Sequence, residues 1–179
     1  ARAGLTSRIM KGSLEIPAAG VKGELTVYQT RPNQMYTVVE IPNITRQERG
    51  FDGKVAWERD TQRGLRLIEG AELDKLQYEA DFDNDMKWRD RYPKAETIAE
   101  EEVGGKPAYK VELTDKNGKK TTHYYDKATN LLVRLNSIYD LQMGEVAVEI
   151  YFEDYKKAGE LLVAHKQRQL LMGMEQIVT

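Results

Sequence analysis

Apolar and polar residues alternate along much of the chain with a period of two. The pattern is clearest in Tyr109–Leu113 and in Glu145–Glu153, where Val146, Val148 and Ile150 fall on one face. Such alternation is typical of a β-strand with one buried face and one wetter face. Because strands of a parallel α/β sheet are apolar on both faces, the pattern favours an antiparallel sheet.

Turn-forming pairs separate these segments at short intervals. Asp52-Gly53, Gly104-Gly105 and Asn117-Gly118 each stand between two stretches with strand-like alternation. The residues of such pairs tolerate the positive φ angles of tight hairpins. Since similar spacing continues on both sides, the sequence predicts a meander of about ten or eleven strands.

One segment departs from the strand pattern. Residues 70–92 contain no β-branched residue, and Leu73, Leu76 and Ala80 follow helical spacing before Pro93. The sequence therefore predicts a helical insertion of one or two helices at about 70–92. Residues 72–102 carry 11 acidic residues against 5 basic ones, which indicates either a solvated helical surface or a negatively charged docking surface.

A long antiparallel sheet must curl or close to manage its edges, and a helix laid into the curl would cover the inner face. We therefore expect an α+β, mainly antiparallel β fold. Its form would be a strongly curved half-barrel with a helical lid. We expect residues 1–179 to form a single domain that is a fragment of a longer chain.

Composition narrows the function classes. The chain has 179 residues, 27 of them basic and 29 acidic, with a net charge of −2. No strong field would draw it to a nucleic acid, so we expect no such partner. The absence of cysteine excludes disulfides and thiolate metal sites. No stretch approaches the roughly 18 apolar residues of a membrane helix, so we do not expect a membrane-spanning chain.

Candidate catalytic groups are sparse. None of the serines, Ser7, Ser13 and Ser137, lies in a G-x-S-x-G turn. The two histidines, His123 and His165, belong to no zinc-binding motif and are predicted to be ordinary strand residues. We therefore expect no enzyme activity, no cofactor and no metal site.

The remaining signal is an excess of amphipathic and adaptable side chains, with ten tyrosines, six methionines and two tryptophans. Tyrosine and tryptophan suit a boundary between dry and wet surroundings, and methionine fills irregular space. On a curled sheet such residues would form the wall of an apolar pocket for an acyl chain. The predicted ligand-binding residues are Leu25, Val27, Met35, Val39, Trp57, Val111, Leu113, Leu135, Val146, Val148 and Ile150.

Four segments resemble motifs of one bacterial family. Gly50–Trp57 reads G-F-D-G-K-V-A-W and resembles the G-F-D-G-x-x-A-W segment of outer-membrane lipoprotein-sorting proteins, the LolA/LolB-like family. Leu67–Leu73 resembles the segment that follows it in the family. Tyr124–Arg134 is similar to the family's Y-F-D-x-x-T-G-L-L-V-R hairpin, although Asn130 stands where glycine is usual. Tyr151–Tyr155 is similar to its Y-x-D-Y strand end.

The resemblance implies a curved antiparallel half-barrel with a hydrophobic cavity for lipoprotein acyl chains or another lipid. It also implies a location in the periplasm or cell envelope of a Gram-negative-type bacterium, facing the outer membrane. Two functions stay open on this basis. The first is a lipid or lipoprotein carrier. The second is a non-catalytic interaction or sensor module of a larger envelope protein, with other envelope proteins as partners.

Overall fold

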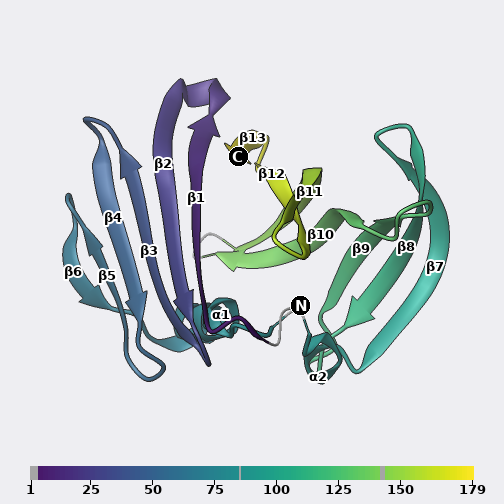
Figure 1. The fold of residues 1–179 in the computed structure, drawn as a ribbon, viewed down its shortest axis with the longest axis horizontal. Helices are drawn as coiled ribbons and strands as arrows, with labels where there is room; N and C mark the ends of the chain where they lie inside the picture. Colours follow the sequence, from purple (N-terminus) through teal and green to yellow (C-terminus); the bar gives the residue numbers. More distant parts are fainter. Residues whose placement is uncertain (1–3, 85, 142–143) are drawn as a thin grey trace. The chain divides into compact units, whose positions relative to one another are not determined.

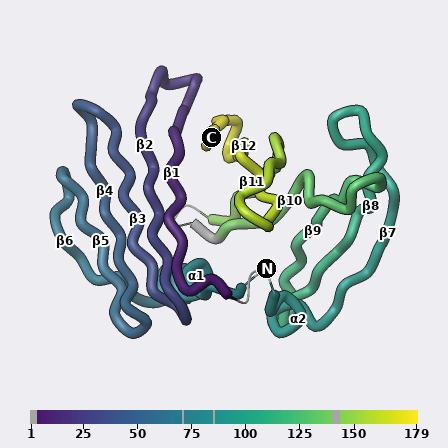
Figure 2. Tube along the Cα trace, viewed as in Figure 1, coloured from purple at the N-terminus to yellow at the C-terminus, as the bar shows by residue number. Residues whose placement is uncertain are grey.

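The structure is a computed structural model that describes residues 4–84, 86–141 and 144–179. The chain divides into two compact units, Ala1–Met86 and Lys87–Thr179, and each is described by itself. Every strand pair within a unit is antiparallel, as the ribbon and the trace show (Figures 1 and 2). The prediction of a mainly antiparallel β fold is confirmed. That the two units form a single domain stays a prediction.

The first unit is a six-stranded meander followed by a helix. Each strand pairs with the next one along the chain, and a short 3-10 turn at Pro17–Ala19 joins the first two. The elements are β1 (Ser7–Ile16), β2 (Val21–Thr30), β3 (Gln34–Ile41), β4 (Thr45–Phe51), β5 (Ala56–Asp60), β6 (Gly64–Leu67) and α1 (Gly70–Ala80).

The second unit begins with a single helical turn and continues as a seven-stranded meander. Its elements are α2 (Trp88–Arg91), β7 (Lys94–Val103), β8 (Lys106–Thr114), β9 (Lys120–Asp126), β10 (Leu132–Leu141), β11 (Gly144–Ala158), β12 (Leu161–Leu171) and β13 (Met174–Val178). The described residues thus form thirteen strands, more than the ten or eleven predicted. The extra strands are β6 and β13, which have four and five residues.

Aspartate side chains hold the predicted turns. Asp52 Oδ1 accepts hydrogen bonds from the backbone N–H of Val55 at 2.7 Å and of Lys54 at 2.8 Å, and these bonds lower the pKa of Asp52. The Asp52-Gly53 hairpin between β4 and β5 is therefore confirmed. Asp126 binds the turn after β9 in the same way, and Asn130 in that turn has a φ of 57°. Asparagine is among the few residues that adopt this left-handed conformation readily.

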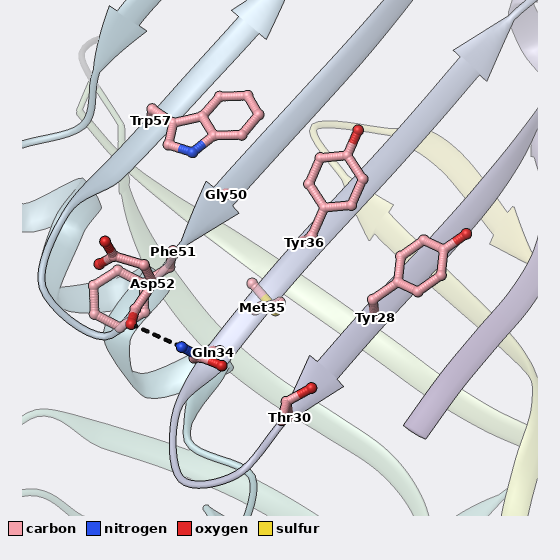
Figure 3. Close-up of a pocket in the computed structure, with 9 residues that line it drawn as sticks. All are labelled: Tyr28, Thr30, Gln34, Met35, Tyr36, Gly50, Phe51, Asp52 and Trp57. Carbon is pink, nitrogen blue, oxygen red and sulfur yellow. Dashed lines mark hydrogen bonds between the residues drawn. The ribbon is translucent and has the colours of Figure 1, made fainter. Parts of the chain in front are cut away.

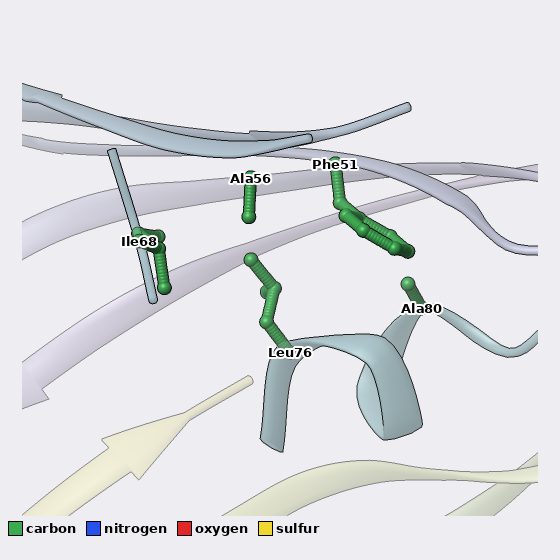
Figure 4. Packing of buried hydrophobic residues seen from close by; sticks show 5 residues of the cluster. All are labelled: Phe51, Ala56, Ile68, Leu76 and Ala80. Carbon is green, nitrogen blue, oxygen red and sulfur yellow. The ribbon is translucent and has the colours of Figure 1, made fainter. Parts of the chain in front are cut away.

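One face of the first sheet packs against α1. Phe51, Ala56 and Ile68 contact Leu76 and Ala80 of the helix, and all five side chains are buried (Figure 4). The alternation of β4 and β5 places Phe51 opposite Ala56, so both point to the helix. The predicted helical segment is confirmed, and the predicted lid is confirmed only for this part of one sheet face.

Ion pairs fasten the helix to the same face. Glu72 of α1 binds Arg66 of β6 through two contacts of 2.8 Å and Arg49 of β4 at 2.7 Å. Glu58 of β5 is buried and binds the same two arginines. The hydrogen bonds from Arg66 lower the pKa of Glu72, so the ionised form of this carboxyl is favoured in the folded unit.

The strand β7 lies at one end of the second meander. It is ten residues long, and its residues from Lys94 to Glu102 are exposed. Its pairing with β8 shifts between Thr97 and Ala99, which leaves Ile98 as a bulge. Within the described ranges, no helix is long and apolar enough to cross a membrane.

Candidate functional site

The helix-bearing face of the first sheet carries four of the predicted ligand-binding residues. The pairing of β2 with β3 places Leu25 opposite Val39, and Val27 and Met35 share their face. All four side chains are half-buried. Met35 packs against the cluster under α1, so this face has a packed part beneath the helix and an apolar part further along the strands.

Six more predicted residues lie together on one face of the second sheet. The strand register forms a row in which Val111 faces His123, His123 faces Leu135, and Leu135 faces Ile150. Leu113 and Val148 are buried, whereas the other four are half-buried. The six residues on this face are Val111, Leu113, Leu135, Val146, Val148 and Ile150.

His123 is a polar side chain within this apolar row. Its Nδ1 lies 3.1 Å from the hydroxyl of Tyr125, and the ring of Tyr92 meets it edge-on with centroids 6.3 Å apart. Burial lowers the pKa of His123 to about 4. Its Nε2 is buried and has no hydrogen-bond partner among the described residues. At neutral pH the imidazole is therefore uncharged, and the row carries no charge.

Trp57 does not share a face with the other predicted residues of its sheet. Ala56 points to α1, so its neighbour Trp57 points to the opposite face. There it belongs to a row of directly opposed residues that crosses all six strands. The row is Ile9, Tyr28, Tyr36, Gly50, Trp57 and Leu67. Alternation alone shows which residues share a face, but not which face meets the helix.

Three rings of this row form what we call the aromatic strip: Tyr28, Tyr36 and Trp57. The ring centroids of Tyr28 and Tyr36 are 5.9 Å apart, and those of Tyr36 and Trp57 are 6.1 Å apart, with interplanar angles of 28° and 38°. Figure 3 shows the three rings side by side on one face of the sheet. Gly50 lies between two of them, and a Cβ there would approach the indole to 2.4 Å. The missing side chain therefore lets the indole lie across β4.

Two open hollows adjoin the strip, and both are lined by Tyr36 and Trp57. The first has a volume of about 280 Å³, and Thr30, Gln34 and Asp52 add polar groups to its lining. The second has a volume of about 570 Å³, and its lining includes Glu48, Arg59, Leu65 and Leu67.

Glu48 forms a compact ionic cluster at the side of the strip. It is only 3% exposed and accepts hydrogen bonds from Arg59 Nε at 2.7 Å and Arg46 Nε at 3.1 Å. Burial disfavours its charged form, but the hydrogen bonds from Arg59, Arg46 and Tyr36 outweigh burial and hold the pKa of Glu48 below its usual range. Because Glu40 also binds Arg46, the charges at this side of the strip largely offset one another.

Carboxylates of the acidic segment 72–102 form ion pairs, most of them with basic residues outside the segment. Its paired carboxylates include Glu72, Glu79, Asp83, Glu96, Glu100 and Glu101. A surface whose charges are already paired offers less to a basic partner. Within the described residues, no three His, Asp or Glu side chains come together as a metal ion would require.

No family model and no curated protein matches the chain, but solved structures do. It is similar to a DUF1329 family protein from Desulfovibrio piger, with a TM-score of 0.65, 14% identity, and coverage of 99% of this chain and 84% of that one. It is similar to a LolA superfamily protein from Nitrosomonas europaea, with a TM-score of 0.63, 11% identity, and coverage of 98% and 84%.

A third similar structure is a domain from Vibrio parahaemolyticus named for outer membrane lipoprotein sorting. Its TM-score is 0.59 and its identity 14%, with 97% of this chain and 83% of that chain covered. At identities this low, the three matches establish likeness of fold and nothing more. Across nearly all of its length, the chain has the LolA-like fold that its four sequence motifs predicted.

Proposed function

We propose that the chain binds the acyl chains of a lipoprotein, or another lipid, and carries them in the periplasm of a Gram-negative-type bacterium. The observation that supports this most is the apolar face of the second sheet. Its row from Val111 to Ile150 contains no charged group at neutral pH, since His123 is neutral there. Most of its apolar residues are only half-buried, which leaves surface for an apolar ligand.

The first sheet offers a second apolar surface with the same character. Leu25, Val27 and Val39 are half-buried on the face that bears α1. An acyl chain needs apolar contacts and no hydrogen bonds, so such a face can hold it without a reactive group. The proposed role is therefore non-catalytic. The lipoprotein-sorting name of one similar structure agrees with this proposal.

The alternative is a non-catalytic interaction or sensor module that docks another envelope protein. Leu65 and Leu67 of β6, which are 72% and 62% exposed, favour it. Large apolar side chains that stand this far into water are found at protein interfaces. This role needs no bound lipid.

Glutamate substitutions test the proposed lipid site. Val27 and Ile150 are half-buried on the two apolar faces, so Val27→Glu and Ile150→Glu should keep the fold and abolish binding of a fluorescent fatty acid. Val148 is 1% exposed, and Val148→Glu should unfold its unit because an unpaired charge would be buried. Thr26 is the neighbour of Val27 on the other face, so Thr26→Glu is the matched control and should bind the probe normally.

Two measurements report the outcome of this experiment. Probe fluorescence reports binding, and mass spectrometry of the purified wild type reports copurified lipid. A wild type that binds no fatty acid and carries no lipid would exclude the carrier role and favour the docking alternative. Equal loss of binding in Thr26→Glu would show that the effect does not depend on the apolar face.

A further inference from the structure

We propose that the aromatic strip is a platform for an extended, β-linked glycan, whose pyranose rings stack on Tyr28, Tyr36 and Trp57. The strip lies on the face of the first sheet that does not bear α1. It is therefore separate from the proposed lipid-binding face, and the inference does not rest on the proposed function.

The first argument is the orientation of the rings. Aromatic neighbours pack either offset-stacked or edge to face. Here the angles between the planes of neighbouring rings are only 28° and 38°, and the three rings lie side by side on one face of the sheet (Figure 3). Tyr28 is 39% exposed. Tyr36 and Trp57 are half-buried and line both open hollows, so part of each of the three rings is accessible to a ligand.

The second argument is Gly50. Any side chain at this position would meet the indole of Trp57, so the ring would have to tilt away from the sheet. The backbone of Gly50 has no positive φ that would require glycine. Glycine in the middle of a strand weakens it and often marks a close approach. The position is explained by the flat placement of the ring.

The third argument is the chemistry beside the strip. A pyranose ring has an apolar C–H face and a rim of hydroxyl groups, so it needs a flat π surface with donors and acceptors beside it. One hollow supplies Thr30, Gln34 and Asp52, and the other supplies Glu48 and Arg59. Such groups can exchange hydrogen bonds with sugar hydroxyls, whereas an acyl chain has no group that could use them.

Another class of flat ligand, nucleic acid bases, fits the strip less well. Nucleic acid bases also stack on aromatic residues of sheets, but their phosphates require a surplus of basic groups. Here Glu48 and Glu40 offset Arg46 and Arg59. A neutral glycan has no such requirement.

The order of the rings in one row selects the type of glycan. Its rings belong to one cross-strand row and follow one another at 5.9 and 6.1 Å. Chains with β-1,4 links extend as flat ribbons, whereas α-1,4-linked chains coil. A single row of rings therefore matches cellohexaose and chitohexaose better than maltohexaose.

Fluorescence titration tests the proposal on the full chain. The chain has two tryptophans, so a Trp88→Phe background leaves Trp57 as the reporter. We expect a saturable change with chitohexaose or cellohexaose, and at least tenfold weaker binding of maltohexaose. Tyr28→Ala should weaken binding by roughly fivefold to tenfold, because it removes one stacking surface.

Gly50→Ala is the sharper variant. It removes no group that would touch a glycan but forces the indole out of the strip, so we expect a loss at least as large as for Tyr28→Ala. Tyr78→Ala is the matched control, since Tyr78 is an exposed tyrosine on α1 and should not affect binding. Circular dichroism checks the fold of each variant. If Gly50→Ala does not fold, the binding measured for Tyr28→Ala decides the test.

Several results would overturn the proposal. One is that neither β-linked oligosaccharide binds, and another is that maltohexaose binds as well as they do. A third is that both strip variants bind like the control. Self-association, or pelleting with anionic phospholipid vesicles, that needs Trp57 and occurs without oligosaccharide binding would assign the strip to a protein or membrane contact instead.

Discussion

His123 should make the second unit lose stability in mild acid. The imidazole is half-buried on the apolar face between Tyr92 and Tyr125, with its Nε2 shielded from water, and this desolvation lowers its pKa from 6.5 to about 4. The unfolded chain therefore binds a proton at a higher pH than the folded unit does. The stability that the neutral ring provides is fully present above about pH 6.5 and is lost as the pH falls toward 4.

The size of the effect follows from the two pKa values. At pH 5 the unfolded imidazole is almost fully protonated, whereas the folded one is mostly neutral. The free energy of unfolding of wild type should thus fall by about 2 kcal/mol between pH 7.5 and pH 5 from this group alone. His123→Phe keeps a ring in the row but cannot titrate, so this part of the pH dependence should disappear.

Urea unfolding at pH 7.5, 6 and 5 measures the effect, with Trp88 fluorescence in a Trp57→Phe background reporting the second unit. The exposed His165 provides the matched control, and His165→Phe should show the wild-type pH dependence. Carboxyl groups contribute equally to all these proteins, so the difference between variants isolates His123. The reasoning is refuted if His123→Phe loses as much stability as wild type between pH 7.5 and pH 5.

Three further predictions concern the folded units. Leu113 is buried, so Leu113→Ala should lower the free energy of unfolding in urea by about 2–5 kcal/mol. Ile150 is half-buried, so Ile150→Ala should lower it less. Equal losses would contradict the division of this face into packed and ligand-accessible residues. Arg66→Ala removes a partner of Glu72, so backbone hydrogen exchange in α1 should become faster. Wild type should lose folding stability below about pH 4.5 because the pKa of Glu72 is lowered in the folded unit, and Arg66→Ala should lack this part of the loss. Asn130 has a left-handed backbone, so Asn130→Val should cost about 1–2 kcal/mol and Asn130→Gly little, as urea midpoints would show.

Much of the fold follows from local rules that the sequence displays. Alternation in Glu145–Glu153 marks β11, and glycine-containing turns fix the hairpins, because only a few residues accept positive φ angles. The segment at 70–92 reads as helical because it lacks β-branched residues. Short strands such as β6 cannot be predicted in this way, since four residues are too few to show a period of two.

The faces of the first sheet show where prediction from sequence fails. An aromatic residue such as Trp57 suggests burial, yet Ala56 faces the helix and Trp57 faces the other way. The helix lies close to the sheet there, and a small side chain fits beneath it. The hairpin at Asp52 did contain a usable signal: its register pairs Gly50 with Trp57 and Phe51 with Ala56. A glycine opposite a tryptophan indicates a ring lying across the strand.

His123 could not be recognised from local sequence for a related reason. Its surroundings are Val111 and Leu135, which come from neighbouring strands and meet it only through the register of β8, β9 and β10. A strand histidine is hydrogen-bonded on the surface in many proteins. The register places this one in an apolar row, and only the row explains its lowered pKa.

The strand β7 has a consequence for how the protein tolerates crowding. A ten-residue strand at the end of a meander could template the addition of strands from other molecules and begin a fibril. Its bulge at Ile98 interrupts the ladder, and Glu100, Glu101 and Glu102 place charged side chains along this edge, which hinders pairing with another strand. These four positions therefore act as protection against polymerisation at high local concentration.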